Sequence, residues 1–149
     1  MIFIPFNTPS LKNSRIMTSR GNFHSPTVRK YLQNIGVKSY SVSKKLVEDY
    51  KGRENLFKRA FSSVDLDSLR HRPLVLGFHP VRNSKRSFDL HNCIHVVLDL
   101  MVAHKYIEDD DADTVAVVPM QNSSGNYYSI DKEQPGIYLS VLNGKTIRY

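Results

Sequence analysis

The sequence has 149 residues, 40% of them hydrophobic, and its 21 Lys and Arg against 14 Asp and Glu give a formal net charge of +7. This length predicts a single domain. No apolar stretch approaches the roughly 18 residues of a membrane-spanning helix, so we expect no membrane association. Residues 1–6 are apolar but lack a preceding basic segment, so we expect no signal peptide. The single cysteine, Cys93, excludes an intrachain disulfide and fits a reducing compartment, so we expect a cytoplasmic protein.

The charge is unevenly distributed along the chain. Residues 1–86 contain 17 Lys and Arg and 5 Asp and Glu, a net charge of +12, whereas residues 87–149 contain 4 and 9, a net charge of −5. A long basic segment followed by a short acidic one predicts a polyanionic partner, such as a nucleic acid, and a separate place for cations. The alternative from composition alone is a basic surface that contacts only solvent.

The N-terminal part of the chain predicts short strands. Residues 2–6 are apolar and end at an Asn-Thr-Pro-Ser run, which is typical of a strand followed by a turn. Residues 15–18 and 22–24 predict a hairpin around Arg20 and the glycine that follows it.

Two helices are predicted next. Ser25 is a candidate N-cap with Pro26 as the first helical residue, apolar residues follow at helical spacing, and Gly36 ends the helix. A second helical stretch is predicted over residues 43–61, with a break near Gly52.

The centre of the chain predicts a strand, a basic loop and a helix. Residues 73–80 contain an apolar run typical of a core strand, residues 82–86 are a basic loop, and residues 89–104 predict the most regular helix. On a helical wheel the apolar face holds Leu90, Ile94, Val97 and Met101, and the polar face holds Asn92, His95 and Asp99. We therefore expect one side of this helix to pack and the other to carry groups that bind protons or metals.

An acidic segment follows the predicted helix. Residues 108–113 contain five carboxylates, which repel one another unless something offsets their charge. Mg²⁺ prefers oxygen ligands and is commonly held by one or two carboxylates and a substrate phosphate. We expect Asp89 to lie at the same end of the domain and to meet Asp109 or Asp110 there. The alternatives are that Asp89 only caps the helix and that residues 108–113 are a solvated turn.

The C-terminal part predicts two strands. They span residues 114–118 and 137–142, and the second is expected to pair through a turn with residues 146–149. Together, the elements predict one α+β domain over residues 1–149.

His91 and His95 are spaced i, i+4, which places both on one side of a helix, as in zinc-binding helices. The glutamate that follows the first histidine in zinc proteases is replaced here by Asn92, so a zinc protease is not expected. The alternative is a pair of ordinary, partly exposed histidines. Cys93 is expected to fill space rather than to act as a nucleophile, and we expect no nucleotide cofactor.

Three segments resemble the core pattern of the RusA-type Holliday-junction resolvases. They are residues 88–92 (Phe-Asp-Leu-His-Asn), Asp99 and residues 107–110 (Ile-Glu-Asp-Asp). They match an Asp-x-Asp-Asn start, an aspartate further along the same helix and a closing Asp-Asp pair. His91 stands where the commonest pattern has a second aspartate and His95 where it has a lysine, although phage-type members also lack that second aspartate.

Residues near the start extend the resemblance over most of the chain. Pro9 and Ser10 with Asn13, and Ser25 with Arg29 and Tyr31, look like the N-terminal turn, hairpin and first helix of that family.

The resemblance implies a small mixed sheet with helices packed on it, a homodimer, and a phage or prophage origin. It also implies a Mg²⁺-dependent endodeoxyribonuclease, with Mn²⁺ as a possible substitute, that binds and resolves four-way DNA junctions in recombination and repair. The metal ligands would be Asp89, Asp109 and Asp110, and the catalytic residues Asp89, His91, His95, Asp99 and Asp110. The expected DNA contacts are Lys12, Arg15, Arg20, Arg82, Lys85 and Arg86. If the protein is phage-encoded, its location would be the host cytoplasm.

Two alternatives remain open. A non-catalytic RusA-like protein with a degenerate metal site would bind DNA without cutting it. An RNA-binding domain would use basic residues with Tyr31, Tyr40 and Tyr50, but no aromatic-rich RNA motif supports it.

Overall fold

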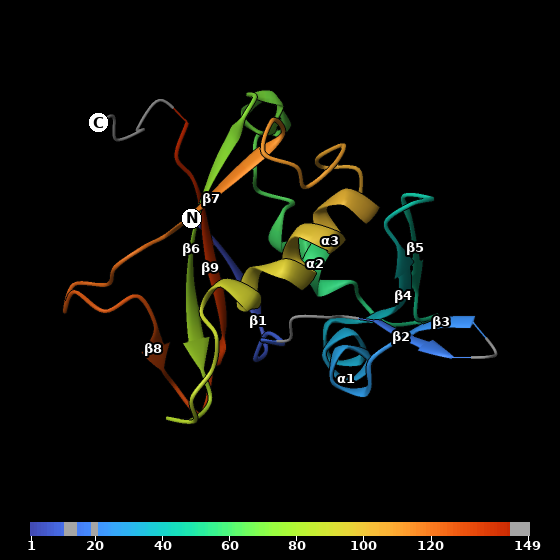
Figure 1. Ribbon diagram of the computed structural model, residues 1–149, viewed down its shortest axis with the longest axis horizontal. Coiled ribbons are helices and arrows are strands. Elements are labelled where there is room, and N and C mark those ends of the chain that lie inside the picture. Colours follow the sequence, from blue (N-terminus) through green and yellow to red (C-terminus); the bar gives the residue numbers. More distant parts are fainter. Residues whose placement is uncertain (11–14, 19–20, 144–149) are drawn as a thin grey trace.

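A mixed five-stranded sheet forms the centre of the computed structural model, which describes residues 1–10, 15–18 and 21–143 (Figure 1). The strand order is β1–β9–β6–β7, and β8 pairs with the end of β6 that β7 leaves free. The middle strand, β6, runs parallel to β7 and β8 and antiparallel to β9. The strands are Ile2–Pro5 (β1), Leu74–Arg82 (β6), Val115–Pro119 (β7), Ser129–Ile130 (β8) and Gly136–Val141 (β9).

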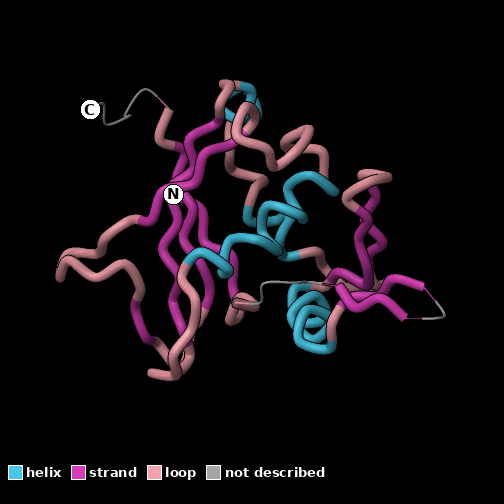
Figure 2. Tube along the Cα trace, viewed as in Figure 1, coloured by secondary structure: helices cyan, strands magenta, loops and turns pink. Residues whose placement is uncertain are grey.

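The helices lie beside this sheet, and two hairpins lie beyond them (Figure 2). α2 contacts β1, and α3 contacts β4. The helices are Pro26–Ile35 (α1), Leu56–Ala60 (α2) and His95–Ala103 (α3), with 3₁₀ turns at Leu66–Arg70 (η1) and His91–Ile94 (η2). The hairpins are Arg15–Thr18 with Gly21–His24 (β2, β3) and Val37–Ser41 with Leu46–Asp49 (β4, β5). The α+β class and the mixed sheet are therefore confirmed.

The α1 helix has the caps that the sequence predicts. It begins at Pro26, and the Ser25 hydroxyl accepts a hydrogen bond from the Val28 N–H at 3.3 Å. Gly36 ends it with a φ of 85°, and a side chain at this position would collide with the Glu54 carbonyl. Glycine is required there both by the left-handed backbone and by the close approach.

Most strands also lie where the sequence places them. β1, β6, β7, β9 and the β2–β3 hairpin coincide with predicted strands to within a few residues. Arg20, expected in the turn of that hairpin, and the strand expected at residues 146–149 lie outside the described residues.

The helix predicted over residues 43–61 is wrong for most of its length. This segment contains β5, which pairs with β4, and only α2 is helical. The chain turns at Lys45 and Gly52, whose φ angles of 51° and 75° are left-handed. A continuous helix cannot pass through these two turns.

The predicted helix over residues 89–104 is divided and more deeply buried than expected. A 3₁₀ turn, η2, precedes α3, and all residues of α3 except His95 and Asp99 are buried. The apolar face is confirmed at Ile94, Val97 and Met101. The expectation of one packed side is wrong because α3 lies between the sheet and the β4–β5 hairpin (Figure 1). No described helix is long and apolar enough to cross a membrane.

Candidate functional site

The acidic segment forms a loop between α3 and β7 that is held by its own backbone. The Asp110 N–H donates to the Asp109 carboxylate at 2.8 Å, and the Thr114 N–H donates to the Asp111 carboxylate at 2.9 Å. The Asp109, Asp110 and Asp111 side chains are exposed. The loop therefore exposes several carboxylates to solvent, and backbone hydrogen bonds orient two of them.

Glu108, the first carboxylate of this loop, has its own cation. Arg72 donates two hydrogen bonds to it, from Nε at 2.8 Å and from Nη2 at 2.6 Å. This paired contact holds the pKa of Glu108 at about 2, below its ordinary value of 4.5. Glu108 therefore forms an ion pair with Arg72.

Asp110 behaves in the opposite way. Partial desolvation raises the pKa of Asp110, and the hydrogen bond and negative charge of Asp109 raise it further. A bound cation offsets the electrostatic repulsion between two neighbouring carboxylates. Asp109 and Asp110 are therefore the two members of the loop best suited to share one.

A cavity of about 510 Å³ lies beside the acidic loop and is bounded by Glu108. Four cations line it: Lys45, Arg70, Arg72 and Lys105. Arg70 pairs with Asp67 at 3.3 Å and Arg72 pairs with Glu108. We call this site the cationic pocket.

Lys45 and Lys105 are the available cations of this pocket. In the described part of the chain, no carboxylate oxygen lies within 4.0 Å of either ammonium group. Both lysines have a left-handed backbone, with φ angles of 51° and 65°. This conformation is uncommon for residues other than glycine, and such outliers gather at functional sites. The pair therefore offers two uncommitted positive charges for an anion.

An aromatic layer supports one wall of the pocket. His104 and Tyr106 stack at 5.8 Å, and Phe57 stacks on His104 at 4.9 Å. The Leu100 carbonyl lies 2.7 Å from His104 Nδ1, so this nitrogen donates to it, and Nε2 accepts from the Asn55 amide at 3.0 Å. Burial lowers the pKa of His104. Stacking and two hydrogen bonds therefore hold this wall, and the lowered pKa favours the neutral form of His104.

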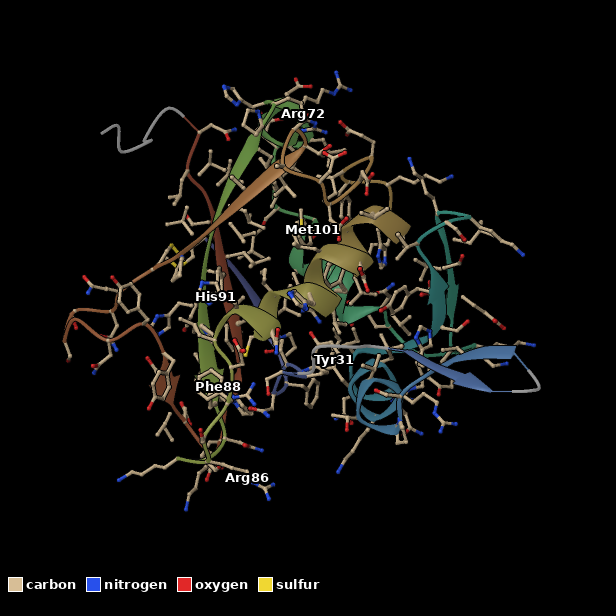
Figure 3. All side chains as sticks on the ribbon, in the orientation of Figure 1. Tyr31, Arg72, Arg86, Phe88, His91 and Met101 are labelled. Atoms are coloured by element: carbon tan, nitrogen blue, oxygen red, sulfur yellow. The ribbon has the colours of Figure 1, made fainter. Side chains whose placement is uncertain are left out.

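The structure does not bring Asp89 to the acidic loop of the same chain. β6 and β7 are parallel, so the segment between them returns from the last residues of β6 to the first residues of β7. Asp89 follows the former and Asp109 precedes the latter. Figure 3 shows this separation: Arg72, beside the acidic loop, lies at the top, and Phe88, next to Asp89, lies well below it. The expectation that Asp89 lies at the same end of the domain as Asp109 and Asp110 is wrong.

Asp89 instead supports the start of η2. Its exposed carboxylate accepts a hydrogen bond from the His91 N–H at 3.1 Å. The N-cap position of η2 is held by Leu90, which makes no side-chain cap hydrogen bond, so Asp89 accepts a backbone N–H beside this turn without being its N-cap residue. Within residues 1–10, 15–18 and 21–143, no three His, Cys, Asp or Glu side chains form a group that could hold a metal ion. A metal centre built by a single chain from Asp89, Asp109 and Asp110 is therefore absent from this part of the structure.

The other predicted catalytic residues lie along η2 and α3. His91 and His95 are exposed near Asp89, not near the acidic loop. Asp99 is half-buried and accepts a hydrogen bond from the Tyr40 hydroxyl at 3.1 Å. It therefore faces the β4–β5 hairpin.

The predicted DNA contacts whose side chains the structure describes fall into two groups. Lys85 and Arg86 are exposed in the loop after β6. Arg82 is held within the chain: it donates to the Thr8 carbonyl at 2.6 Å and lies over the Phe88 ring, 4.6 Å from its centre. Lys12 and Arg20 lie outside the described residues. For Arg15 the structure describes only the backbone, in β2.

The tyrosines named for RNA binding are mostly core residues. Tyr31 and Tyr40 are each 3% exposed, and burial raises the pKa of Tyr31. Tyr50 is half-buried beneath Arg53, which lies 4.9 Å from its ring centre. Tyr31 and Tyr40 are therefore not available to stack on bases.

No pattern in the sequence predicted the cationic pocket. Lys45 falls within the wrongly predicted helix, and Lys105 directly follows α3. These lysines meet only because the β4–β5 hairpin packs beside α3, a contact between distant parts of the sequence. A tight turn at Lys45, had it been recognised, would have been the one local indication of this pocket.

Comparison with protein-family models, curated proteins and solved structures finds no match to this chain.

Proposed function

We propose that this protein is a Mg²⁺-dependent endodeoxyribonuclease that binds and resolves four-way DNA junctions, as its resemblance to the RusA-type resolvases implies. The observation that carries the proposal is the acidic loop beside the cationic pocket. Exposed carboxylates at Asp109 and Asp110 suit a metal ion, and the uncommitted Lys45 and Lys105 suit the phosphates of the substrate.

The acidic loop fits Mg²⁺ only as part of a shared site. Its donors are carboxylate oxygens, the type that Mg²⁺ prefers, but among the described residues of one chain no third His, Cys, Asp or Glu side chain completes such a group. Mg²⁺ commonly accepts one or two carboxylates and completes its shell with waters and a substrate phosphate. Asp109 and Asp110 would hold the ion under this proposal, and Mn²⁺ could replace it.

A homodimer offers a way to add Asp89 to the same site. Asp89 and the acidic loop flank opposite ends of the η2–α3 segment. A two-fold axis perpendicular to this segment exchanges its ends, so Asp89 of one copy would approach Asp109 and Asp110 of the other. His91 and His95 are exposed along this segment and would lie in the contact. We therefore propose a site shared between two chains, which also suits two symmetric cuts.

The chain's own groups would then have separate tasks. Lys45 and Lys105 would bind phosphates and position the DNA backbone, and Lys85 and Arg86 would extend the contact. His91, beside Asp89, would take a proton from the attacking water. When bound, the metal ion would lower the pKa of water and neutralise charge on the scissile phosphate.

A complementation experiment tests the shared site. Asp89→Asn and Asp110→Asn are each expected to lose cleavage of a labelled four-way junction with Mg²⁺ by orders of magnitude, while junction binding persists. If the site is shared, mixed dimers of the two variants contain one site with both native aspartates, and nicking returns. If all ligands come from one chain, every site in the mixed dimer carries one substitution and the mixture stays inactive. Full cleavage by both single variants would refute the site.

A non-catalytic junction-binding protein is the second candidate. The separation of Asp89 from Asp109 and Asp110 within one chain favours it, because the described residues of a single chain contain no group of three His, Cys, Asp or Glu side chains that could hold a metal ion. It predicts junction binding by the native protein without Mg²⁺-dependent cutting at any protein concentration. The change His91→Asp, which restores the commoner family residue, would then be the first variant to examine for cutting.

A further inference from the structure

A serine and a histidine form a hydrogen-bonded pair far from the acidic loop. Ser129 lies in β8, and His79 lies near the end of β6. The distance from Ser129 Oγ to His79 Nε2 is 2.7 Å. His79 is 6% exposed, and Ser129 is half-buried.

The hydrogen-bond partners of His79 determine which way the protons point. His79 Nδ1 lies 2.8 Å from the Met120 carbonyl oxygen. A carbonyl can only accept, so Nδ1 carries the proton and, in the neutral ring, Nε2 has a free lone pair. Nε2 therefore accepts the hydrogen of the Ser129 hydroxyl. A nucleophile, a base and a third group that orients the base form the arrangement found in enzymes that activate a hydroxyl.

A third side chain, Asn122, approaches the same hydroxyl oxygen. Its Nδ2 donates to Ser129 Oγ at 3.2 Å. The orientation of the Asn122 amide is fixed because its Oδ1 accepts the backbone N–H groups of Ser124 and Asn126, both at 3.0 Å. An amide N–H held beside a nucleophile can stabilise an oxyanion that forms next to it.

These groups open onto a cavity instead of a closed core. His79, Asn122 and Ser129 all line a cavity of about 210 Å³, and Met120 and Tyr138 contribute apolar walls. Cavities that enclose drug-sized ligands have volumes of about 300–1,000 Å³. The volume and the apolar walls therefore suit a short acyl group.

We propose that Ser129 is an activated nucleophile that accepts a short acyl group from a small ester. Its oxygen bonds to the carbonyl carbon while His79 Nε2 takes the hydroxyl proton, and Asn122 donates to the oxyanion. The bond to the alcohol oxygen then breaks, and the alcohol leaves with the proton from His79. Water attacks the Ser129 ester, gives its proton to His79, and releases the carboxylic acid and the free hydroxyl.

The pair could serve only to attach β8 to β6, and covalent labelling distinguishes the two roles. A fluorophosphonate probe reacts with an activated serine by forming an O–P bond and releasing fluoride. Peptide mapping of the labelled native protein needs no variant. Label concentrated on Ser129 supports the proposal, whereas absence of label, or label spread over several serines, overturns it.

Variants then connect labelling with turnover of p-nitrophenyl acetate and butyrate. Ser129→Ala should lose the label and the hydrolysis, and His79→Gln should slow both about 100-fold, a typical contribution of a positioned base. Ser123→Ala, an exposed serine in the neighbouring loop, is the matched control and should react like the native protein. Circular dichroism verifies that each variant is folded. Hydrolysis by Ser129→Ala at the native rate would also overturn the proposal.

Discussion

Replacing the two uncommitted lysines of the cationic pocket should weaken the salt dependence of DNA binding. The change is Lys45→Gln with Lys105→Gln, which removes two positive charges that have no carboxylate within 4.0 Å in the described part of the chain. Neither side chain is buried, so we expect the double variant to fold normally.

The size of the effect follows from counting phosphates. Each phosphate neutralised on duplex DNA contributes about 0.9 to the slope of log K against log salt. Two lysines should thus account for a slope of about 1.8. Between about 50 and 200 mM salt, the native protein should lose about 12-fold more affinity than the double variant.

The assay is fluorescence anisotropy of a labelled four-way junction, titrated at several salt concentrations without Mg²⁺ to prevent cutting. Lys51→Gln with Lys132→Gln is the matched control, because it removes two exposed lysines that do not line the pocket. An unchanged slope in the pocket variant would refute the assignment of the pocket to phosphates. An equal change in both double variants would show that net charge, not the pocket, determines the slope.

Two further predictions concern stability. Gly52→Ala should lower the free energy of unfolding by about 1–2 kcal/mol, because alanine disfavours the left-handed backbone at this position. Gly36→Ala should lower it by more, because the new Cβ also collides with the Glu54 carbonyl. Urea unfolding measures both losses, and equal losses would contradict the role of this collision. Arg72 holds the pKa of Glu108 at about 2, below the ordinary 4.5, so the stability that this pair contributes should be present above about pH 4.5 and disappear as the pH falls toward 2. Unfolding midpoints between these pH values should fall less steeply in Arg72→Gln, and an unchanged slope would show that the pair does not contribute.

Local signals in the sequence predicted the elements that are stabilised locally. The caps of α1 are an example, because the Ser25 hydroxyl and Gly36 act on the turns next to them. The segment 43–61 shows the limit of such signals. Its β5 strand is stabilised by pairing with β4, and apolar residues in so short a run fit a strand as well as a helix.

The placement of Asp89 was wrong for a reason of topology. A strand, a helix and a second strand in succession favour a parallel connection. In such a connection the chain leaves the end of the first strand and returns through the helix to the opposite end of the sheet, where the second strand begins. From the geometry of a strand followed by a helix we expected Asp89 to meet Asp109 or Asp110, but their positions around this crossover keep them apart within one chain. The sequence therefore identified the candidate carboxylates without the geometry that relates them.

The burial of α3 restricts how related chains can differ in length. Seven of its nine residues are buried, on nearly all sides. Inserting one residue into this helix would rotate everything beyond it by about 100° and would carry Asp99 from its contact with Tyr40 toward an apolar neighbour. Insertions and deletions between Asp89 and Asp110 should therefore be found in the segments that flank His95–Ala103, and the helix itself should keep a constant number of residues.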